Sequence, residues 1–369
     1  MTFCAPCLLG MEGICANDLK FNGFKNVRAE NGRVLFDGDY GTMVRANLLS
    51  RYSERIQILL SEFYAYSFEE LFENVRIIPW ENYICRTSAF PVKGSSLSSR
   101  LRSISDCQKI IKKAVVDRLS GKYGLSWFEE SFSARQIQFL IMNDKVSILL
   151  DTSGQGLHKR GYRAVSNDAP MKETLAAAMV DLARVRPNHL VVDPMCGSGT
   201  ILIEAAQKAL KIAPGLMREF SFESWEQVPA RIIREEREYA AQLENRDCNF
   251  SAIGYDIDEN ALEISRENAK KAGVSDRISF VKRDIRDFTF DGDFETVITN
   301  PPYGERLLDI EGAEKLYGIM GEKFLREKGK SYTIISPDDD FERVFGRKAD
   351  KRRKLYNGML NCQVYMYFK

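Results

Sequence analysis

The stretch 190-LVVDPMCGSGTILI-203 decides the fold class of this sequence. An apolar run of strand type, Leu190–Asp193, leads through small residues into a helical pattern that begins at Thr200. Gly197 and Gly199 let a ligand approach the backbone of the turn, and the following helix offers N–H groups that lack partners within the helix. This order predicts a βα unit of a parallel sheet with a ligand at its turn.

The residues of the turn favour a cationic or amino-bearing ligand over a phosphate. A Walker loop needs a Lys after its final glycine, where this sequence has Thr200. A dinucleotide fingerprint wants a small residue where Leu202 stands, and the acidic Asp193 would repel a pyrophosphate. S-adenosylmethionine carries a sulfonium and an α-amino group, so it is the cofactor we expect here.

The sequence around this unit alternates regularly between strand-like and helical patterns from Glu173 onward, which predicts a doubly wound, mostly parallel sheet. An Asn357-Gly358 turn signal before an apolar strand predicts a closing antiparallel hairpin, typical of the class I methyltransferase fold. The expected strands are 189–193, 252–256, 278–281, 296–299 and 332–336, and the expected helices are 172–184, 200–209, 259–271 and 313–326.

Acidic residues also end the next two predicted strands. Asp256 is placed to accept both ribose hydroxyls of a nucleoside, whereas Asp258 is better explained as a helix N-cap. Asp284 is placed to accept the adenine amino group, with Ile285 against the ring. Any one of these aspartates alone could equally be a cap. Three acids that end three successive strands, after a glycine-rich turn, predict a cofactor site.

The fourth predicted strand ends in Asn300-Pro-Pro-Tyr303, beside the expected position of the sulfonium methyl. An exocyclic purine amine is a poor nucleophile because its lone pair is delocalised into the ring. The Asn300 side-chain oxygen and the Pro301 carbonyl can accept its two N–H bonds and direct the lone pair at the methyl. Pro301 and Pro302 stiffen the corner, and Tyr303 offers a stacking face to an extruded base. We expect these four residues to be catalytic, through alignment and electrostatics.

The N-terminal 155 residues mix short strand-like runs with helical ones, which predicts an α+β region. The formal net charge is only +1, but positive charge is concentrated in two stretches, from Arg86 to Lys122 and from Glu342 to Lys354. Such stretches suggest contact with phosphates. The alternative, at about even odds for either stretch, is a solvated helix face.

Composition argues against membrane and metal-binding classes. No apolar run approaches the roughly 20 residues of a membrane span, and the N-terminus lacks the basic region of a signal peptide. Eight cysteines at irregular spacing fit reduced thiols in the cytoplasm. Cys4-x-x-Cys7 has no second pair, and the only histidines are His158 and His189, so we expect no metal.

Several motifs of the C-terminal half resemble those of the guanosine-N2 rRNA methyltransferases related to the N-terminal half of RlmL. The resemblance implies a ferredoxin-like region over 1–50, a THUMP RNA-binding domain over 51–155, a linker over 156–172 and a methyltransferase domain over 173–369. The motifs are Leu157-His-Lys-Arg-Gly-Tyr-Arg163, Ala169-Pro-Met-Lys-Glu-Thr-Leu-Ala176, Asp193-Pro-Met-Cys-Gly-Ser-Gly-Thr200, Ile212-Ala-Pro-Gly215, Asn300-Pro-Pro-Tyr-Gly-Glu-Arg306 and Lys351-Arg-Arg-Lys-Leu-Tyr-Asn-Gly358.

The resemblance further implies an enzyme that transfers a methyl group from S-adenosylmethionine to the N2 amine of a guanosine in 23S rRNA. Glu173, in the second motif, joins the residues expected to bind the cofactor, namely Asp193, Gly197, Gly199, Asp256, Asp284, Ile285 and Asn300. The residues expected to contact RNA are Lys93, Arg100, Lys112, Lys113, Arg118, Lys122, Lys159, Arg160 and Arg163.

Two other interpretations of the residues stay open. An adenine-N6 DNA methyltransferase would share the Asn300–Tyr303 corner, although it would usually carry a DNA target-recognition domain. A catalytically silent RNA-binding THUMP protein would not need that corner. A C5-pyrimidine enzyme is disfavoured because no cysteine stands at the corner, and Cys196 in the turn is better explained as a small packed residue.

Overall fold

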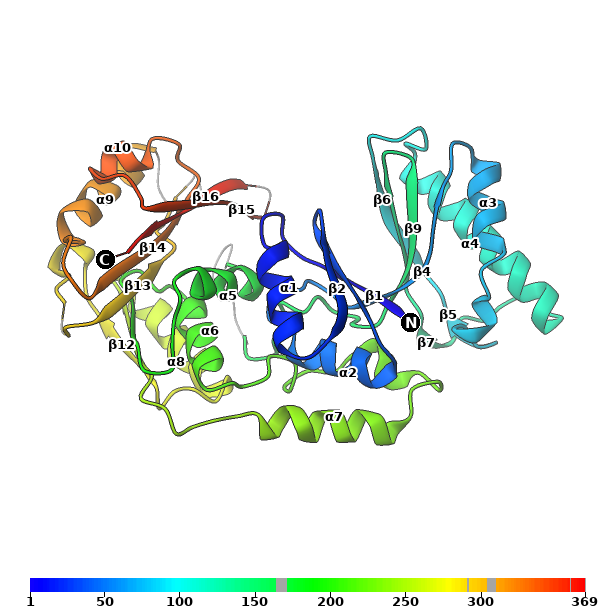
Figure 1. The fold of residues 1–369 in the computed structure, drawn as a ribbon, viewed down its shortest axis with the longest axis horizontal. Coiled ribbons are helices and arrows are strands. Elements are labelled where there is room, and N and C mark those ends of the chain that lie inside the picture. Colours follow the sequence, from blue (N-terminus) through cyan, green and yellow to red (C-terminus); the bar gives the residue numbers. More distant parts are fainter. Residues whose placement is uncertain (164–170, 291, 304–309, 359, 369) are drawn as a thin grey trace.

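The computed structural model describes residues 1–163, 171–290, 292–303, 310–358 and 360–368. Figure 1 shows that the chain forms two lobes, each built on a sheet with helices packed against it. Within the described ranges each main sheet has seven strands. A small parallel pair, β5 (Ser88–Ala89) with β7 (Phe132–Ala134), lies in the N-terminal lobe.

The N-terminal sheet runs through both regions that the sequence analysis separates. Its order is β2-β3-β1-β4-β9-β8-β6, and β1 pairs with β4 through Phe3 opposite Ile58. The regions expected over 1–50 and 51–155 therefore share one sheet, and their boundary stays a prediction. The strands are β1 (Thr2–Pro6), β2 (Lys25–Glu30), β3 (Arg33–Asp37), β4 (Gln57–Tyr64), β6 (Val92–Leu97), β8 (Ile137–Met142) and β9 (Lys145–Asp151); the helices are α1 (Glu12–Phe21), α2 (Tyr40–Leu49), α3 (Phe68–Arg76) and α4 (Ile104–Tyr123).

Local sequence sets the ends of the long helix α4. The Ser103 hydroxyl caps its start by accepting a hydrogen bond from the Asp106 N–H at 3.3 Å. Gly124 ends the helix with a φ of 66°, a left-handed conformation that glycine adopts without steric cost. One face of the helix, with Ile111 and Leu119, is buried in the lobe, where α4 contacts α3 and β6.

The C-terminal sheet has the order β12-β11-β10-β13-β14-β16-β15. Its first five strands are parallel, and β16 and β15 form the antiparallel hairpin expected from the Asn357-Gly358 signal. The predicted fold class is confirmed. The elements are α5 (Glu173–Leu182), β10 (Leu190–Asp193), α6 (Thr200–Ala209), α7 (Ala230–Gln242), β11 (Ser251–Asp256), α8 (Glu259–Lys271), β12 (Ile278–Lys282), β13 (Glu295–Thr299), α9 (Ile310–Lys323), β14 (Lys330–Ser336), α10 (Phe341–Phe345), β15 (Lys351–Asn357) and β16 (Leu360–Tyr367).

The segment between α6 and β11 packs against the N-terminal lobe. Helix α7 lies along α2, where Arg45 forms a bidentate ion pair with Glu236 at 2.7 and 2.8 Å. At Gly215 a Cβ would lie 2.7 Å from the Asn47 carbonyl oxygen, so the close approach of the two lobes requires glycine. The two lobes thus meet through packed backbone and paired charges.

Residues 151–163, which include the start of the linker expected over 156–172, are partly buried. Thr152 and Tyr162 are completely buried, and Leu157 is nearly so. Gly161 is exposed, but a Cβ there would lie 2.7 Å from the Met217 carbonyl oxygen, so that position requires glycine. The boundaries 156–172 stay a prediction, because residues 164–170 lie outside those that the structure describes.

Candidate functional site

Three neighbouring parallel strands bring the predicted cofactor and catalytic residues to one edge of the C-terminal sheet. In register, Asp193 of β10 lies opposite Gly254 of β11, and Val192 lies opposite Val297 of β13. Asp193, Asp256 and Asn300 therefore follow or end adjacent strands at their carboxyl ends. This edge is where ligands of open α/β sheets bind.

The turn after β10 has the geometry of a ligand cradle. Gly197 has a φ of 51°, and nothing lies within 4 Å of the position that a Cβ would occupy there. Gly199, with a φ of 75°, forms the N-cap of α6, whose first N–H groups have no partners within the helix. Cys196 is buried beneath the turn, as its interpretation as a packed residue requires.

Asp193 is the most buried acid of this edge, with 1% of its surface exposed. Burial raises the pKa of its carboxyl from 3.8 to about 7. Its Oδ1 atom accepts a hydrogen bond from the Met195 N–H at 3.2 Å. A buried carboxyl with so few partners favours a cationic ligand, because a cation beside it would stabilise its ionised form.

Asp256 joins the turn to the end of β11. Its Oδ2 accepts the Gly197 N–H at 2.8 Å, and its Oδ1 accepts the Asp258 N–H at 3.0 Å. A carboxylate has about four acceptor sites, so two remain, one on each oxygen. Two remaining acceptors fit the predicted grip on two ribose hydroxyls. Asp258 caps α8 through the Asn260 N–H, as the sequence predicts.

Asp284 has a partner that the sequence analysis missed. Arg286 donates to it through its backbone N–H at 2.8 Å and its guanidinium at 3.0 and 2.6 Å. The Arg286 guanidinium lowers the pKa of the Asp284 carboxyl to about 2. Little acceptor capacity remains on Asp284, so its predicted bond to an adenine amine would compete with Arg286. Ile285 is buried beside it.

The corner after β13 carries a buried acceptor without a partner. Asn300 Oδ1 is inaccessible to solvent and forms no hydrogen bond with any residue that the structure describes. Leaving such a group unpaired costs ~1–3 kcal/mol, which a ligand N–H donor would recover. Pro301 is buried and Pro302 half-buried, and the residues that follow Tyr303 in the motif lie outside the described ranges.

Asn357, in the β15–β16 hairpin, positions the Tyr303 side chain by a hydrogen bond. Its Nδ2 donates to the Tyr303 hydroxyl at 2.7 Å, and burial raises the pKa of that hydroxyl. In the sequence, Asn357 is recognisable only as a turn residue. No local pattern connects the two residues, because they are 54 positions apart and are brought together only by the closing hairpin.

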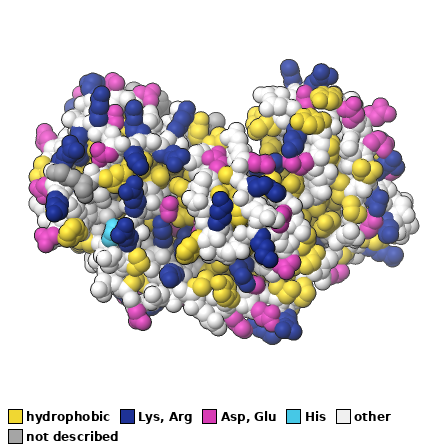
Figure 2. Space-filling view, in the orientation of Figure 1, with side chains coloured by type: hydrophobic (Ala, Val, Ile, Leu, Met, Phe, Trp, Pro, Cys, Tyr) yellow, Lys and Arg dark blue, Asp and Glu magenta, His cyan; other side chains and the backbone are white. Residues whose placement is uncertain are grey.

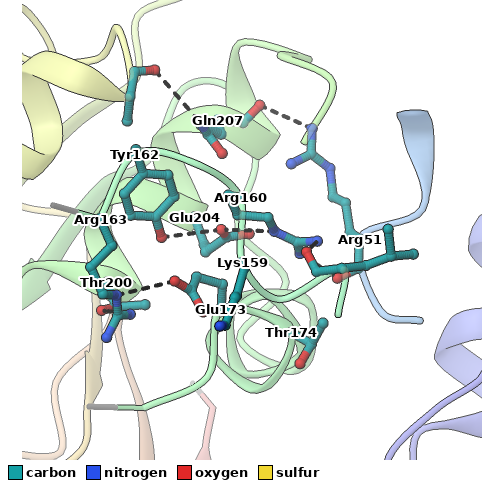
Figure 3. A network of polar contacts seen from close by, with 12 residues as sticks. Arg51, Lys159, Arg160, Tyr162, Arg163, Glu173, Thr174, Thr200, Glu204 and Gln207 are labelled. Carbon is teal, nitrogen blue, oxygen red and sulfur yellow. Dashed lines mark hydrogen bonds and ion pairs between the residues drawn. The ribbon is translucent and has the colours of Figure 1, made fainter. Parts of the chain in front are cut away.

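A buried polar network lies beneath the turn (Figure 3). Arg163 forms an ion pair with Glu173 at 3.1 Å and donates to the Thr200 hydroxyl at 2.9 Å. Arg160 forms an ion pair with Glu204 of α6 at 3.4 Å, with both side chains almost fully buried. Arg160, expected above to contact RNA, is therefore an internal residue, because its charge is engaged out of reach of solvent. Burial raises the pKa of the Glu173 carboxyl, whose cofactor role stays a prediction.

Several of the basic residues expected to contact RNA are already paired. Lys112 binds Glu130, and Arg118 binds Glu81 through two hydrogen bonds at 3.0 and 2.6 Å. The Lys113 ammonium lies 5.6 Å from the centre of the Phe72 ring. The exposed ones are Lys93, Arg100, Lys113, Lys122 and Lys159 on the N-terminal side, joined by Lys351, Arg352, Arg353 and Lys354 on the edge strand β15.

Within the described ranges, no helix is long and apolar enough to cross a membrane, and no group of three or more His, Cys, Asp or Glu side chains could hold a metal ion.

Three protein-family models match the chain. An RMKL-like methyltransferase domain matches residues 160–366, an RlmL ferredoxin-like domain matches residues 2–57, and a THUMP domain matches residues 65–151. The first of these models covers more than half of the chain. The chain belongs to the RMKL-like methyltransferase family. The predicted family is confirmed, and with it the assignment of S-adenosylmethionine as the cofactor.

Two curated relatives share this arrangement. "Putative RNA methyltransferase YpsC" of Bacillus subtilis is 39% identical over 369 residues, which cover 100% of this chain and 96% of that protein. "Ribosomal RNA large subunit methyltransferase K/L" of Psychromonas ingrahamii is 32% identical over 380 residues, which cover 100% of this chain and 50% of that protein. The chain thus spans about half the length of this second relative.

Two solved structures have a fold similar to that of this chain. One is described as "a predicted N6-adenine-specific DNA methylase" from Listeria monocytogenes, with a TM-score of 0.93, 41% identity and coverage of 100% of this chain and 96% of that one. The other is "SMU.472, a putative methyltransferase complexed with SAH", with a TM-score of 0.93, 39% identity and coverage of 100% and 97%.

Proposed function

We propose that this chain is an S-adenosylmethionine-dependent RNA methyltransferase that methylates the N2 amine of a guanosine in 23S rRNA. The observation that carries the proposal is the buried, unpaired Asn300 Oδ1 at the same sheet edge as Asp193 and Asp256 in the part of the chain that the structure describes. The THUMP match and the name of the Psychromonas relative support an rRNA substrate, which we expect to be met in the cytoplasm.

The residues at the carboxyl edge of the sheet would have separate roles in binding the cofactor and the target base. The bound cofactor supplies an electrophilic methyl group. Asp193 suits its α-amino group and Asp256 its ribose, so these two acids would fix the position of the methyl. Gly197 leaves room for the ligand above the turn.

Asn300 and Pro301 would orient the target. Their two oxygens would accept the two N–H bonds of the exocyclic amine, which leaves its lone pair pointed at the methyl. The nitrogen would accept the methyl that the bound cofactor supplies, the cofactor would leave as its neutral thioether, and the amine would lose a proton to water. The role of Asn300 is alignment and stabilisation of developing positive charge, so no strong base is needed.

A second candidate is methylation of the N6 amine of adenine in DNA, the activity named for the Listeria protein. The corner chemistry serves either amine, so geometry at Asn300 does not separate the two. The THUMP match favours RNA, whereas exposed basic residues would suit the phosphates of either polymer.

The test uses the full chain with S-adenosylmethionine tritiated on its methyl group. It is incubated with 23S rRNA from a strain that lacks the gene, and in parallel with unmethylated genomic DNA. We expect label in the rRNA, recovered as N2-methylguanosine after digestion to nucleosides, and labelling about a hundredfold slower with the Asn300→Ala variant. Label in the DNA as N6-methyladenine would establish the second candidate, and label in neither polymer would overturn both.

A further inference from the structure

The outer tip of the N-terminal lobe carries two exposed tyrosines whose rings lie parallel. Tyr64, at the end of β4, and Tyr66 have 60% and 46% of their surfaces exposed. Their ring centres are 6.5 Å apart, with an angle of 15° between the planes. The Arg100 guanidinium lies 4.9 Å from the centre of the Tyr66 ring. Aromatic rings and an arginine thus form one surface.

The β8–β9 turn holds the two loops of this tip in place. Asp144 in that turn has a φ of 64°, and its carbonyl accepts the Ala65 N–H at 3.1 Å. Its carboxylate accepts the Arg100 N–H at 2.6 Å, and its own N–H donates to Ser99 Oγ at 3.0 Å. One residue therefore fixes both the loop that carries Tyr66 and the loop that carries Arg100.

The charge of Arg100 remains available at this tip. The nearby carboxylates of Asp144 and Glu70 accept backbone N–H groups, from Arg100 and Tyr66 respectively. In the part of the chain that the structure describes, no carboxylate lies within ion-pair distance of the Arg100 guanidinium. The helix α4 differs, since Lys112 and Arg118 there are paired with Glu130 and Glu81.

We propose that Tyr64, Tyr66 and Arg100 form a stacking platform for unpaired bases of the RNA substrate. The proposal rests on the proposed function, because it names where that substrate is gripped. Every base has a π-face, so exposed rings hold single-stranded RNA with little regard to sequence, and an arginine adds a contact to phosphate or to the ring face. A duplex keeps its bases stacked internally and offers no such face.

The position of the platform suits a substrate that also reaches the catalytic corner. In Figure 1 the tips of β4, β6 and β9 and the β15–β16 hairpin, which holds Tyr303, both lie toward the upper side of the view. Figure 2 shows the surface hollowed between the two lobes on this side, with Lys and Arg side chains along both of its flanks. An RNA held at the tip would pass over this hollow toward Asn300.

The test compares single-stranded with duplex RNA. A fluorescein-labelled RNA of mixed sequence, about 12 nucleotides long to match the site sizes of single-strand binders, is titrated with the full chain, alone or annealed to its complement. Binding is followed by fluorescence anisotropy. The double variant Tyr64→Ala/Tyr66→Ala should bind the single strand about tenfold more weakly or worse, as expected for lost base stacking. Tyr66→Phe keeps the ring and should bind within about twofold of the wild type.

The salt dependence of RNA binding distinguishes base stacking on the tyrosine rings from a phosphate contact by Arg100. Arg100→Ala should reduce the slope of log affinity against log salt by about 0.7, the value for one phosphate contact to a single strand, whereas the tyrosine variants should leave that slope unchanged. Phe21→Ala removes another exposed aromatic ring, on α1, and is the matched control, expected to bind as the wild type does. Unchanged cofactor affinity and melting temperature would show that each variant is folded.

Two results would overturn the platform. One is wild-type affinity of the double tyrosine variant for the single strand. The other is an equal loss for the duplex, which would mean that the tip recognises backbone shape. Either result leaves the proposed function standing if the wild type still labels rRNA. Absence of rRNA labelling by the wild type would instead remove the proposed function, whatever the binding data show.

Discussion

Replacing Asp193 by Asn tests whether the buried acid of the turn is poised to receive a cation. The pKa of Asp193 is about 7 in the folded chain, against an ordinary value of 3.8. The difference of about 3 pH units corresponds to roughly 4 kcal/mol, at 1.36 kcal/mol for each unit. This is the order of the free energy needed to keep the carboxyl ionised in its buried position.

The sign of the effect follows from the raised pKa. Protonated Asp193 favours the folded state, so its contribution is complete below about pH 4 and is lost as the pH rises through about 7. The amide introduced by the substitution does not titrate. Without cofactor, the Asp193→Asn variant should therefore gain stability relative to the wild type between about pH 4 and 8, by up to roughly 4 kcal/mol on the same scale.

Urea unfolding at about pH 5, 6, 7 and 8, followed by circular dichroism, measures this difference. Asp258→Asn is the matched control, since Asp258 is an exposed helix cap and asparagine caps a helix about as well as aspartate, so its replacement should change stability little. Added S-adenosylmethionine should stabilise the wild type more at the alkaline end of this range than at the acid end, and should stabilise Asp193→Asn much less. A stability difference between Asp193→Asn and wild type that stays constant across the range would refute the reasoning.

Three further predictions concern the same edge. Asn300→Ala should keep cofactor and RNA affinity within a few-fold of the wild type but slow single-turnover methylation about a hundredfold, the usual loss for one preorganised polar partner. A fully active variant would contradict the proposed mechanism. Asp256→Ala should weaken cofactor binding by roughly 1.5–3 kcal/mol in calorimetry, and unchanged affinity in a folded variant would remove its ribose role. Asn357→Ala and Tyr303→Phe break the same hydrogen bond, so each should lower the methylation rate only mildly, and their effects should not add in the double variant. Tyr303→Ala also removes the ring and should lower the rate much more. Additive losses in the double variant would show that Asn357 acts elsewhere.

The sequence predicts the parts of this site that depend on short spacings. The helix expected over 259–271 is α8 to the residue, and the acids that end β10 and β11 lie at the same edge of the sheet, as their positions require. These features follow from local rules, because parallel strands bring their carboxyl ends to one edge and glycines mark the turn between strand and helix.

Contacts between distant segments could not be read in the same way. The basic stretch Arg86–Lys122 does not show that Lys112 and Arg118 are neutralised, because Glu130 and Glu81 reach them only through the fold. Arg160 stands in a basic, glycine-rich run that is typical of an exposed linker. Its burial depends on Glu204, which is 44 positions away on α6.

That burial bears on how the two lobes work together. Arg160 also donates to the Arg51 carbonyl of the N-terminal lobe at 2.5 Å, so its guanidinium bridges that lobe and α6, the helix that begins at the cofactor turn (Figure 3). A buried ion pair contributes little net stability, yet removing one partner costs about 3–5 kcal/mol. Separation of the lobes would break the hydrogen bond from Arg160 to the Arg51 carbonyl, so this contact helps to hold α6 at a fixed place relative to the N-terminal lobe. The outer tip would then lie at a fixed distance from Asn300. For an RNA bound at the tip, the nucleotide that reaches Asn300 would depend on the shape of the RNA between the tip and Asn300.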